Sequence, residues 1–374
     1  MRIALVVPGG VGRDGEHQVI PAILWIIERL ARRHDVQVIV HHQEARAGSW
    51  ELLGATVHNI GTRLWRIDAV RTLRRLHRQK AFDLFHAIWA RGPGEVALFA
   101  ARMSGRPVVV HVAGGELVWL ADIDFGTSGR WRRALVRRVV RGADRVTAAS
   151  GIMEELIAEA GRRADRVPLG ADTSVWTPEP PRPRSGARPA RLVHVGSLTP
   201  VKDHPTLLRA VALLVRDGWS LQLDLVGEDA WDGSVQRRAD ELRIADRVVF
   251  HGFLPQRRAI PVVRAADLMV VASRHEAGPV AMMEAAAVGV PTVGTAVGHV
   301  RDWAPEAAAA VPVGDADALA REIGALLSDD SRRLAMAERA QQAALREDAD
   351  WTCARIEELY AEVLGYGTSR GARS

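Results

Sequence analysis

Short apolar runs alternate with longer amphipathic stretches along most of this chain. Short β-branched runs are typical of buried strands, and apolar residues spaced by three and four are typical of helices. In the first half the pattern predicts strands at residues 3–8, 36–40, 82–86, 107–112 and 145–149. It predicts helices there at residues 20–33, 70–79, 95–103, 131–141 and 152–160.

The alternation stops at a proline-rich polar stretch, residues 177–189, and then starts again. Strands are predicted beyond it at residues 191–195, 221–226, 247–251, 268–272 and 291–295. Helices are predicted at residues 206–216, 235–243, 257–265, 280–288 and 316–327. Such alternation favours parallel sheets with helices on both faces.

We therefore predict an α/β protein of two doubly wound, Rossmann-like domains, 1–172 and 191–350, joined by a linker at 173–190. Sheets of this kind bind ligands beyond the carboxyl ends of their strands, so the two domains are expected to face each other across a cleft. A helix at 351–364 is expected to pack back on the first domain. The tail, 365–374, is expected to be disordered.

The bulk composition is that of a soluble globular protein with room for two cores. The chain has 374 residues, of which 48% are hydrophobic and 25% charged,. Its single cysteine, Cys353, excludes an intrachain disulfide and fits a reducing compartment,. No apolar run reaches the roughly 20 residues that span a bilayer. We expect a cytoplasmic protein.

Arginine supplies nearly all the positive charge, since Lys80 and Lys202 are the only lysines in the sequence. The net charge is +5, and arginine is concentrated at residues 63–78 and 130–141. These stretches favour an anionic partner, for example the inner surface of a membrane, where the protein would be peripheral. The alternative is an ordinary solvated helix face. No nucleic-acid-binding motif is present, so no nucleic-acid partner is expected.

The most informative segment places Glu276 and Glu284 around the start of a predicted helix. Gly278 is expected at the N-cap, Pro279 at the first helical position and Gly289 just past the end. A helix N-terminus attracts anions such as a diphosphate. Each carboxylate would then contact the group attached to one end of the bound diphosphate. The alternative is a pair of ordinary surface glutamates.

Two further loops bear on an anion site. Lys202 lies in the first strand–loop–helix of the second half, where a compact ammonium suits a point contact to phosphate. Residues 10–15 spell G-x-G-x-x-G, but no acidic residue ends the second strand, so a dinucleotide site is not favoured. That loop is expected to be a flexible turn. Acids and histidines show no spacing typical of a metal site, and we predict none.

These motifs together resemble those of family-4 retaining glycosyltransferases, which have the GT-B architecture (glycosyl transferases group 1). The resemblance rests on Gly196-Ser197-Leu198, Lys202, the pair Glu276-x₇-Glu284, and Gly289-Val290-Pro291 in this order. Weaker likenesses are found at residues 167–172, 225–227, 250–252, 298–302 and 351–360.

The resemblance implies transfer of a sugar from a nucleotide diphosphate-sugar donor to a hydroxyl acceptor, with retained anomeric configuration and without metal or other cofactor. The resemblance does not identify the acceptor; a glycan, a lipid-linked compound or a small molecule would each offer a hydroxyl. By this resemblance, Lys202 would bind the donor diphosphate, and the turn Gly278-Pro279-Val280 would offer backbone N–H groups to the same phosphates. Glu284 would bind the ribose hydroxyls, and Glu276 would contact the donor sugar. Gly15 would let the first domain approach the donor closely. Ser197 replaces the family's arginine beside Gly196.

The first half supplies the acceptor-side candidates. The family often has a catalytic histidine after the fourth strand, and His111 is the candidate here, with a structural role as the alternative. Glu116, beside two glycines, is expected to bond an acceptor hydroxyl. His86, expected at a strand end, and His17, near the glycine loop, are weaker candidates. Two other functions stay open: another GT-B enzyme, such as an epimerase or phosphorylase, and a silent sugar-nucleotide-binding protein.

Overall fold

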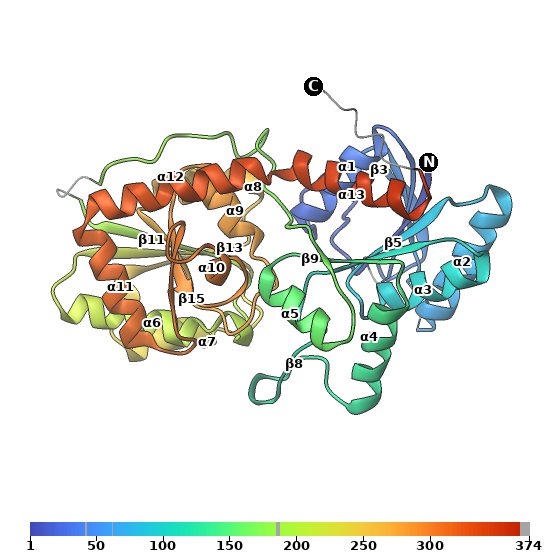
Figure 1. Ribbon diagram of the computed structural model, residues 1–374. Helices are drawn as coiled ribbons and strands as arrows, with labels where there is room; N and C mark the ends of the chain where they lie inside the picture. The colour runs from blue at the N-terminus through green and yellow to red at the C-terminus, as the bar shows by residue number, and fades with distance from the viewer. Residues whose placement is uncertain (42, 62, 185–187, 367–374) are drawn as a thin grey trace, which may run out of the picture. The chain divides into compact units, whose positions relative to one another are not determined.

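The chain folds into two compact units. The computed structural model describes residues 1–41, 43–61, 63–184 and 188–366. The first unit comprises Met1–Leu169 together with Ala349–Ser374, and the second comprises Gly170–Asp348 (Figure 1). Most of the tail expected at 365–374 lies outside the described residues.

The first unit is built on an eight-stranded sheet of order β10-β9-β6-β5-β1-β2-β4-β3. Its strands are β1 (Arg2–Val7), β2 (Asp35–Val40), β3 (Gly48–Leu52), β4 (Ala55–Asn59), β5 (Leu84–Ile88), β6 (Val108–Val112), β9 (Arg145–Ala148) and β10 (Asp165–Arg166). All neighbours pair in parallel except β3 and β4. That hairpin was not predicted: Leu53 and Gly54 both take positive φ, as a two-residue hairpin turn demands, although Leu is an unusual residue there,.

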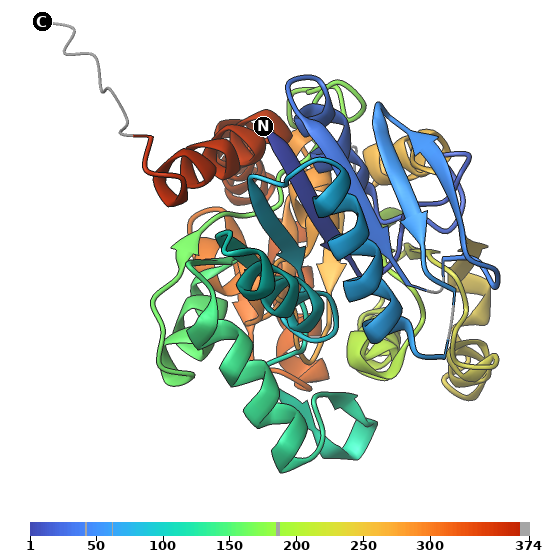
Figure 2. The same ribbon diagram turned by 90° about the vertical axis from the view of Figure 1, so that its right-hand side faces the viewer.

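Helices cover both faces of this sheet, as Figures 1 and 2 show. One face carries α2 (Trp65–Gln79), α3 (Pro93–Ser104), α4 (Arg130–Gly142) and α5 (Gly151–Glu159). The other carries α1 (Pro21–Ala31) and α13 (Ala349–Val363), which lie side by side. Between β6 and α4 the chain forms a small loop with β7 (Trp119–Leu120), η1 (Ala121–Ile123) and β8 (Phe125–Gly126).

The closing helix α13 is fastened to the first unit by buried and surface contacts. The Tyr360 hydroxyl and His86 Nδ1 are 2.7 Å apart in the interior, and Glu357 pairs with Arg33 and His34 at the surface. The predicted position of His86 was therefore wrong: β5 runs to Ile88, two residues further than expected, so His86 lies within the sheet under α13.

The second unit is a six-stranded parallel sheet of order β13-β12-β11-β14-β15-β16. Its strands are β11 (Ala190–Val195), β12 (Leu221–Val226), β13 (Val248–Gly252), β14 (Leu268–Val271), β15 (Thr292–Thr295) and β16 (Ala308–Val311). One face carries α6 (His204–Arg216), α7 (Ser234–Glu241) and α11 (Ala316–Ser328), and the other carries α8 (Gln256–Ala265), α9 (Val280–Ala287) and α12 (Asp330–Arg346). The short elements are η2 (Pro200–Lys202), η3 (Ala245–Arg247) and α10 (Gly298–Trp303). Leu and Val side chains from β11, β12, α6 and α11 form its main core.

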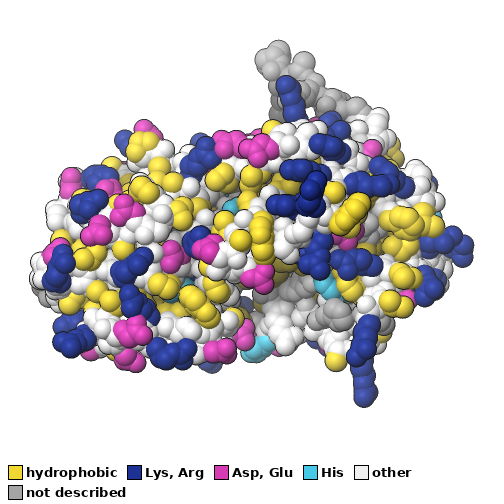
Figure 3. All heavy atoms as spheres, turned by 90° about the horizontal axis from the view of Figure 1, so that it is seen from below, with side chains coloured by type: hydrophobic (Ala, Val, Ile, Leu, Met, Phe, Trp, Pro, Cys, Tyr) yellow, Lys and Arg dark blue, Asp and Glu magenta, His cyan; other side chains and the backbone are white. Residues whose placement is uncertain are grey.

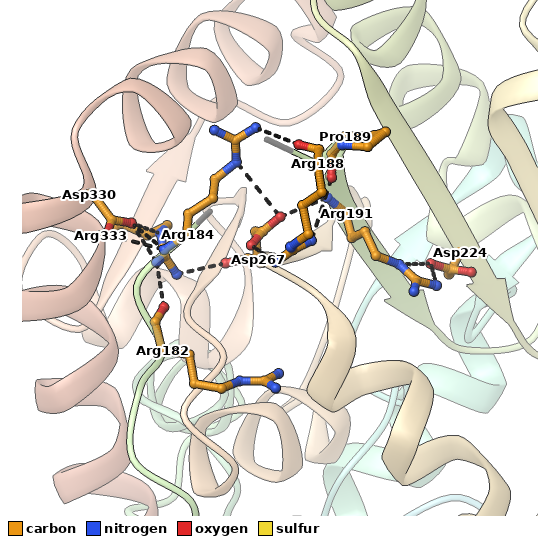
Figure 4. A network of polar contacts seen from close by, with 9 residues as sticks. All are labelled: Arg182, Arg184, Arg188, Pro189, Arg191, Asp224, Asp267, Asp330 and Arg333. Atoms are coloured by element: carbon orange, nitrogen blue, oxygen red, sulfur yellow. Dashed lines mark hydrogen bonds and ion pairs between the residues drawn. The ribbon is translucent and has the colours of Figure 1, made fainter. Parts of the chain in front are cut away.

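The proline-rich stretch before β11 is not a free linker. Arg333 of α12, only 2% exposed, donates 2.7 Å to the Arg182 carbonyl and also bonds Asp330. The Arg184 backbone N–H bonds the same Asp330 carboxylate, and Arg188 pairs with Asp267 just before β14 (Figure 4). The described part of 173–190 is therefore anchored to the second unit, with residues 185–187 outside the description.

Candidate functional site

Lys202 and Glu276 meet at the carboxyl edge of the second sheet. Lys202 ends η2 in the loop after β11, and Glu276 follows β14. Since β11 and β14 are neighbouring parallel strands, their loops leave the sheet at the same edge. The order changes direction between these two strands, which is where doubly wound sheets bind ligands. Lys202 Nζ lies 2.6 Å from Glu276 Oε1.

The same glutamate oxygen takes a second hydrogen bond, from the Ser273 hydroxyl at 2.6 Å. Burial alone raises the pKa of Glu276, but the Lys202 ammonium and Ser273 together more than offset it, so the pKa lies below its ordinary value,. Glu276 is thus held as a carboxylate whose charge is balanced by a single lysine.

A glycine and a histidine shape the space around Lys202. A Cβ at Gly196 would come within 3.2 Å of Lys202 Cε and 3.4 Å of His194 Nε2, so the glycine leaves room for both. His194 donates from Nδ1 to the Val270 carbonyl at 2.8 Å, and burial lowers the pKa of His194 to about 4. Sequence reasoning missed His194, because a histidine inside a strand carries no distinguishing signal. Ser197 is exposed in the next position of the turn.

The helix start was predicted one residue too early. The helix α9 begins at Val280, and its N-cap is Pro279, with ψ 108° in the extended region, rather than Gly278. Pro279 has no N–H, so within this turn only Gly278 and Val280 carry the N–H groups that we expected to face an anion. Gly298 of α10 packs on the same turn, and a Cβ there would lie 3.1 Å from the Glu276 carbonyl.

Glu284 lies in the second turn of α9 and is 7% exposed. Its Oε1 accepts a hydrogen bond from Gln256 Nε2 at 3.0 Å. Burial raises the pKa of Glu284 to about 7, and Gln256 and the side chain of Trp176 only partly offset this. Gln256 was also missed, since a polar residue at a helix start has the pattern of an ordinary cap.

Glu116 lines a pocket of about 510 Å³ in the first unit. Its Oε1 accepts the Ala90 N–H at 3.0 Å, and burial raises the pKa of Glu116. Pro8, His41, Trp89 and Gly114, also in the lining, follow β1, β2, β5 and β6, so the pocket opens at the carboxyl edge of the first sheet. Glu116 therefore lies in a pocket at this edge, and its acceptor role stays a prediction.

The positions of the candidate histidines are less favourable for an active-site role. His111 lies within β6, 1% exposed, with Nδ1 2.7 Å from the Thr147 hydroxyl, and burial lowers the pKa of His111 to about 4. This geometry favours the structural alternative. His17 is exposed and bonds Asp14 in the glycine loop at 2.7 Å. Gly15 of that loop takes φ 69°, and a Cβ there would meet nothing within 4 Å.

Two absences hold for the part of the chain that the structure describes. No group of three His, Cys, Asp or Glu residues is placed to hold a metal ion. No described helix combines the length and apolarity that a membrane crossing requires.

Both units match known families in sequence. Residues 179–343 match the family described as glycosyl transferases group 1, and residues 19–170 match the glycosyl transferase 4-like domain. A D-inositol 3-phosphate glycosyltransferase of Xylanimonas cellulosilytica is 30% identical over 329 residues, 72% of this chain and 77% of the relative. Against the enzyme of that name from Corynebacterium urealyticum, at 31% identity, the match spans 51% of this chain and about half, 49%, of the relative.

Solved structures agree on the fold. Sucrose-phosphate synthase of Thermosynechococcus elongatus superimposes with a TM-score of 0.79 at 18% identity, over 98% of this chain and 100% of that one. Anabaena HepE, solved with UDP-glucose, superimposes with a TM-score of 0.75 at 19% identity, over 97% of this chain and 100% of that one. The chain therefore belongs to the group 1 glycosyltransferases, the family-4 type with the GT-B fold of two Rossmann-like domains.

Proposed function

We propose that this protein transfers a sugar from a nucleotide diphosphate-sugar donor to a hydroxyl acceptor, with retention of anomeric configuration. The observation that carries this proposal is the Lys202–Glu276 pair, 2.6 Å apart at the switch point of the second sheet. The names of similar proteins support it, since the Xylanimonas relative is a glycosyltransferase and HepE was solved with UDP-glucose.

Each residue of the pair has a distinct task in the proposed reaction. The bond from the anomeric carbon to the phosphate oxygen breaks, and negative charge develops on the leaving diphosphate. The Lys202 ammonium and the N-terminus of α9 supply fixed positive charge there, the kind of preorganised electrostatics that lowers such barriers most. Glu276 exchanges its contact with Lys202 for the donor sugar. The acceptor oxygen attacks the same face, and its proton passes to the leaving phosphate oxygen.

The proposal includes independence from divalent metal, because a lysine and a helix terminus take over the role of a cation. Donor turnover should therefore be unchanged by excess EDTA and unaffected by added Mg²⁺ or Mn²⁺. A loss of turnover with EDTA that Mn²⁺ restores would refute this part of the proposal and leave the rest standing.

The test is a screen of the purified protein against labelled sugar nucleotides, with and without a panel of hydroxyl acceptors. Slow donor hydrolysis or a glycosylated product supports a transferase, and NMR of the product's anomeric proton decides retention. An isomerised donor indicates an epimerase, phosphate-dependent sugar release a phosphorylase, and tight binding without turnover a silent module. Unchanged turnover in Lys202→Ala and Glu276→Gln would show that the site is wrongly assigned.

The proposed partner of the arginine-rich helices is an anionic membrane surface. Six large apolar side chains are exposed on or next to α2, α3 and α4: Leu64, Ile67, Phe99, Met103, Trp131 and Leu135. Trp131 is 90% exposed, and α4 carries six arginines and no acid. Figure 3 shows basic side chains (dark blue) beside exposed apolar ones (yellow). Arginine with interfacial tryptophan is the composition of a helix that lies on a lipid surface.

Sedimentation with vesicles tests this contact. Phosphatidylcholine vesicles containing phosphatidylglycerol should carry the protein down, and pure phosphatidylcholine vesicles should not. The double variant Arg132→Glu with Arg133→Glu should lose most of this binding, whereas the matched pair Arg237→Glu with Arg238→Glu on α7 should retain it. Equal binding to both vesicle types, or equal loss in both variants, would contradict the membrane proposal.

A further inference from the structure

Four exposed arginine side chains line a groove between two helices of the first unit. The helices α3 and α4 lie side by side on one face of the sheet (Figures 1 and 2). Their groove has a volume of about 470 Å³, within the ordinary range for small-molecule sites,. Its lining contains Arg102 of α3 and Arg137, Arg138 and Arg141 of α4, and no acidic residue among those described. The groove therefore concentrates one kind of positive group, the guanidinium.

The groove is distinct from the pocket that contains Glu116. That pocket reaches Pro93, the first residue of α3. Arg102 lies nine residues further along the same helix, about 14 Å along its axis,. On α4 the arginines of the groove likewise lie in the last two turns. A ligand in the groove would therefore lie toward the amino edge of the first sheet, away from its carboxyl edge.

The positive charge of the groove is not balanced by the described residues. None of its four guanidinium groups pairs with a described carboxylate. The acids nearest to them in sequence are engaged elsewhere. Glu95 of α3 pairs with Arg66 at 2.7 Å. Asp144, which follows α4, accepts the Val108 N–H at 2.8 Å. The C-terminus of a helix offers only about half a negative charge, so most of the positive charge is left over.

Two of the four arginines are held in place by the neighbouring backbone. Arg141 Nε donates to the Ala160 carbonyl at 2.7 Å, which leaves the other donors of this guanidinium without a described partner. A Cβ at Gly142 would lie 2.8 Å from Arg102 Nη2, so the glycine leaves room for Arg102 beside the end of α4. Because part of the groove is fixed before a ligand arrives, less conformational freedom is lost on binding.

The guanidinium group is well suited to phosphate. Each group presents a planar fork of N–H donors that matches two phosphate oxygens. Forks from two helices can share the several oxygens of one phosphate group, or of two adjacent ones. A carboxylate offers two oxygens and would leave most of these donors to water. The composition of the groove therefore favours a ligand with phosphate groups.

We propose that the groove between α3 and α4 binds a phosphate monoester or a short polyphosphate, with Arg102 and Arg138 holding it from the two helices. The ligand is a lipid headgroup or a soluble phosphate compound, since both present the same oxygens. This site goes beyond the proposed sugar transfer, because it uses none of the candidate donor or acceptor residues. It also goes beyond the proposed membrane contact, for which diffuse positive charge suffices.

The competing explanation is that these arginines form an ordinary solvated face near the partial negative charge of a helix C-terminus. The double variant Arg102→Gln with Arg138→Gln separates the two explanations, because it removes one fork from each helix and leaves the anchored Arg141 in place. The matched control is Arg132→Gln with Arg133→Gln, which removes the same amount of charge from positions of α4 outside the groove. Charge alone would make the two pairs behave alike.

Calorimetric titration with tripolyphosphate measures binding to the groove. The titrations are made in the Lys202→Ala protein, whose candidate donor site has lost its cation. We expect one saturable site, with binding about tenfold or more weaker in Arg102→Gln with Arg138→Gln, because hydrogen bonds to a charged ligand are lost. We expect at most about a twofold change in the control pair, since charges outside the groove are screened by salt.

Vesicles of matched surface charge distinguish the two sources of phosphate. Phosphatidic acid exposes a phosphate monoester, whereas phosphatidylglycerol carries a diester. If the ligand is a lipid headgroup, the protein should prefer vesicles with phosphatidic acid, and Arg102→Gln with Arg138→Gln should abolish that preference. Tripolyphosphate binding without this preference identifies a soluble phosphate compound as the ligand.

The proposal is overturned if tripolyphosphate saturates no site, or if the groove pair and the control pair weaken its binding equally. Failure of the proposed sugar transfer is a different result, since donor hydrolysis would then be absent from the unaltered protein whether or not tripolyphosphate binds. With Lys202 in place, the groove pair should hydrolyse donor at the rate of the unaltered protein. Thermal unfolding shows whether each variant has kept its fold.

Discussion

The carboxyl edges of the two sheets carry opposite kinds of chemistry on closely similar frameworks. At the edge of the second sheet, Lys202, Glu276 and Glu284 are charged or titratable groups held by side-chain partners. At the edge of the first sheet, Trp65, Trp89 and Phe125 surround one carboxylate. Both sites form where the strand order changes direction, so the topology decides their place,.

The difference indicates which kind of ligand each edge can bind. A fixed ammonium beside a helix N-terminus suits a ligand that gains negative charge, as a departing diphosphate does. Aromatic faces with a single acceptor suit a neutral ligand with apolar faces and hydroxyl edges. The doubly wound sheet permits either chemistry, and the loops select between them.

The largest expected effect tests the charged edge. Replacing Lys202 by Ala should lower the kcat of donor hydrolysis by about 10²–10³-fold, because the leaving diphosphate loses its nearest fixed cation. The chain contains one other lysine, Lys80, which pairs with Asp35 in the first unit. Lys80→Ala should leave kcat within about twofold. Similar losses in both variants would show that the effect is structural rather than catalytic.

The second prediction concerns how the segment leading into the second sheet is fastened. Arg333→Ala should lower the free energy of unfolding by about 2–4 kcal/mol, since two backbone carbonyls lose their charged donor and the partly exposed Asp330 loses its partner,. Its neighbour Arg332 makes a largely exposed pair with Glu322, and Arg332→Ala should cost about 1 kcal/mol or less,. Denaturant unfolding of both variants measures the difference, and equal losses would mean that the segment is not anchored as described.

The third prediction uses pH to examine Glu284. Its folded-state pKa is about 7, against an ordinary 4.5, so the folded protein binds more protons than the unfolded chain between these values. Its contribution to stability is therefore present below about pH 4.5 and is lost as the pH rises through 7, a total of about 3 kcal/mol. Glu284→Gln should be the more stable protein at pH 8, with the gap closing by pH 5.

Urea unfolding measures the difference in stability between Glu284→Gln and the unaltered protein. The same difference at pH 5 and at pH 8 would show that Glu284 does not titrate with a raised pKa. The same variant should raise the KM for the donor and change kcat less, because its proposed role is to bind the ribose. A fall in kcat with unchanged KM would contradict that role.

The smallest expected effect concerns the fastening of the first unit. Tyr360→Phe removes the hydroxyl that bonds His86 Nδ1 in the interior and should cost about 1–3 kcal/mol,. The chain's other tyrosine, Tyr366, is exposed, and Tyr366→Phe should be neutral. Calorimetric melting distinguishes the two, and no effect of Tyr360→Phe would mean that α13 is held by its apolar and ionic contacts alone.

Patterns within short stretches of sequence predicted most of the fold. The predicted strand at 221–226 has the same bounds as β12, because alternating apolar and polar residues between two loops define both ends of a strand,. β16 (Ala308–Val311) was missed, since a run of alanines has helical propensity and becomes a strand only by pairing with β15,. α10 and the β3–β4 hairpin were missed because their local signals are weak: α10 has only six residues, and the hairpin turns at Leu53-Gly54, where leucine is unusual.

The candidate site divides in the same way. Glu276 and Glu284 could be found from their spacing around a predicted strand, turn and helix, and Lys202 because it is one of only two lysines in the sequence. The 2.6 Å contact between Lys202 and Glu276, which lie 74 positions apart, could not. The folded structure is needed to single out Ser273, His194 and Gln256, because only their contacts in space connect them with the site. Trp89 is likewise singled out only by its φ of 79°.

The sequence by itself determined the two alternating halves, the charged motif of the second and the glycine-flanked carboxylate of the first. Periodicity and turn chemistry act over a few residues, so they can be recognised without knowledge of the rest of the chain. Tertiary structure alone decided that the proline-rich stretch is anchored, that His86 and His111 are buried, and that aromatic residues from three separate segments line one pocket. Those outcomes depend on burial and on contacts between distant segments, which no local pattern contains.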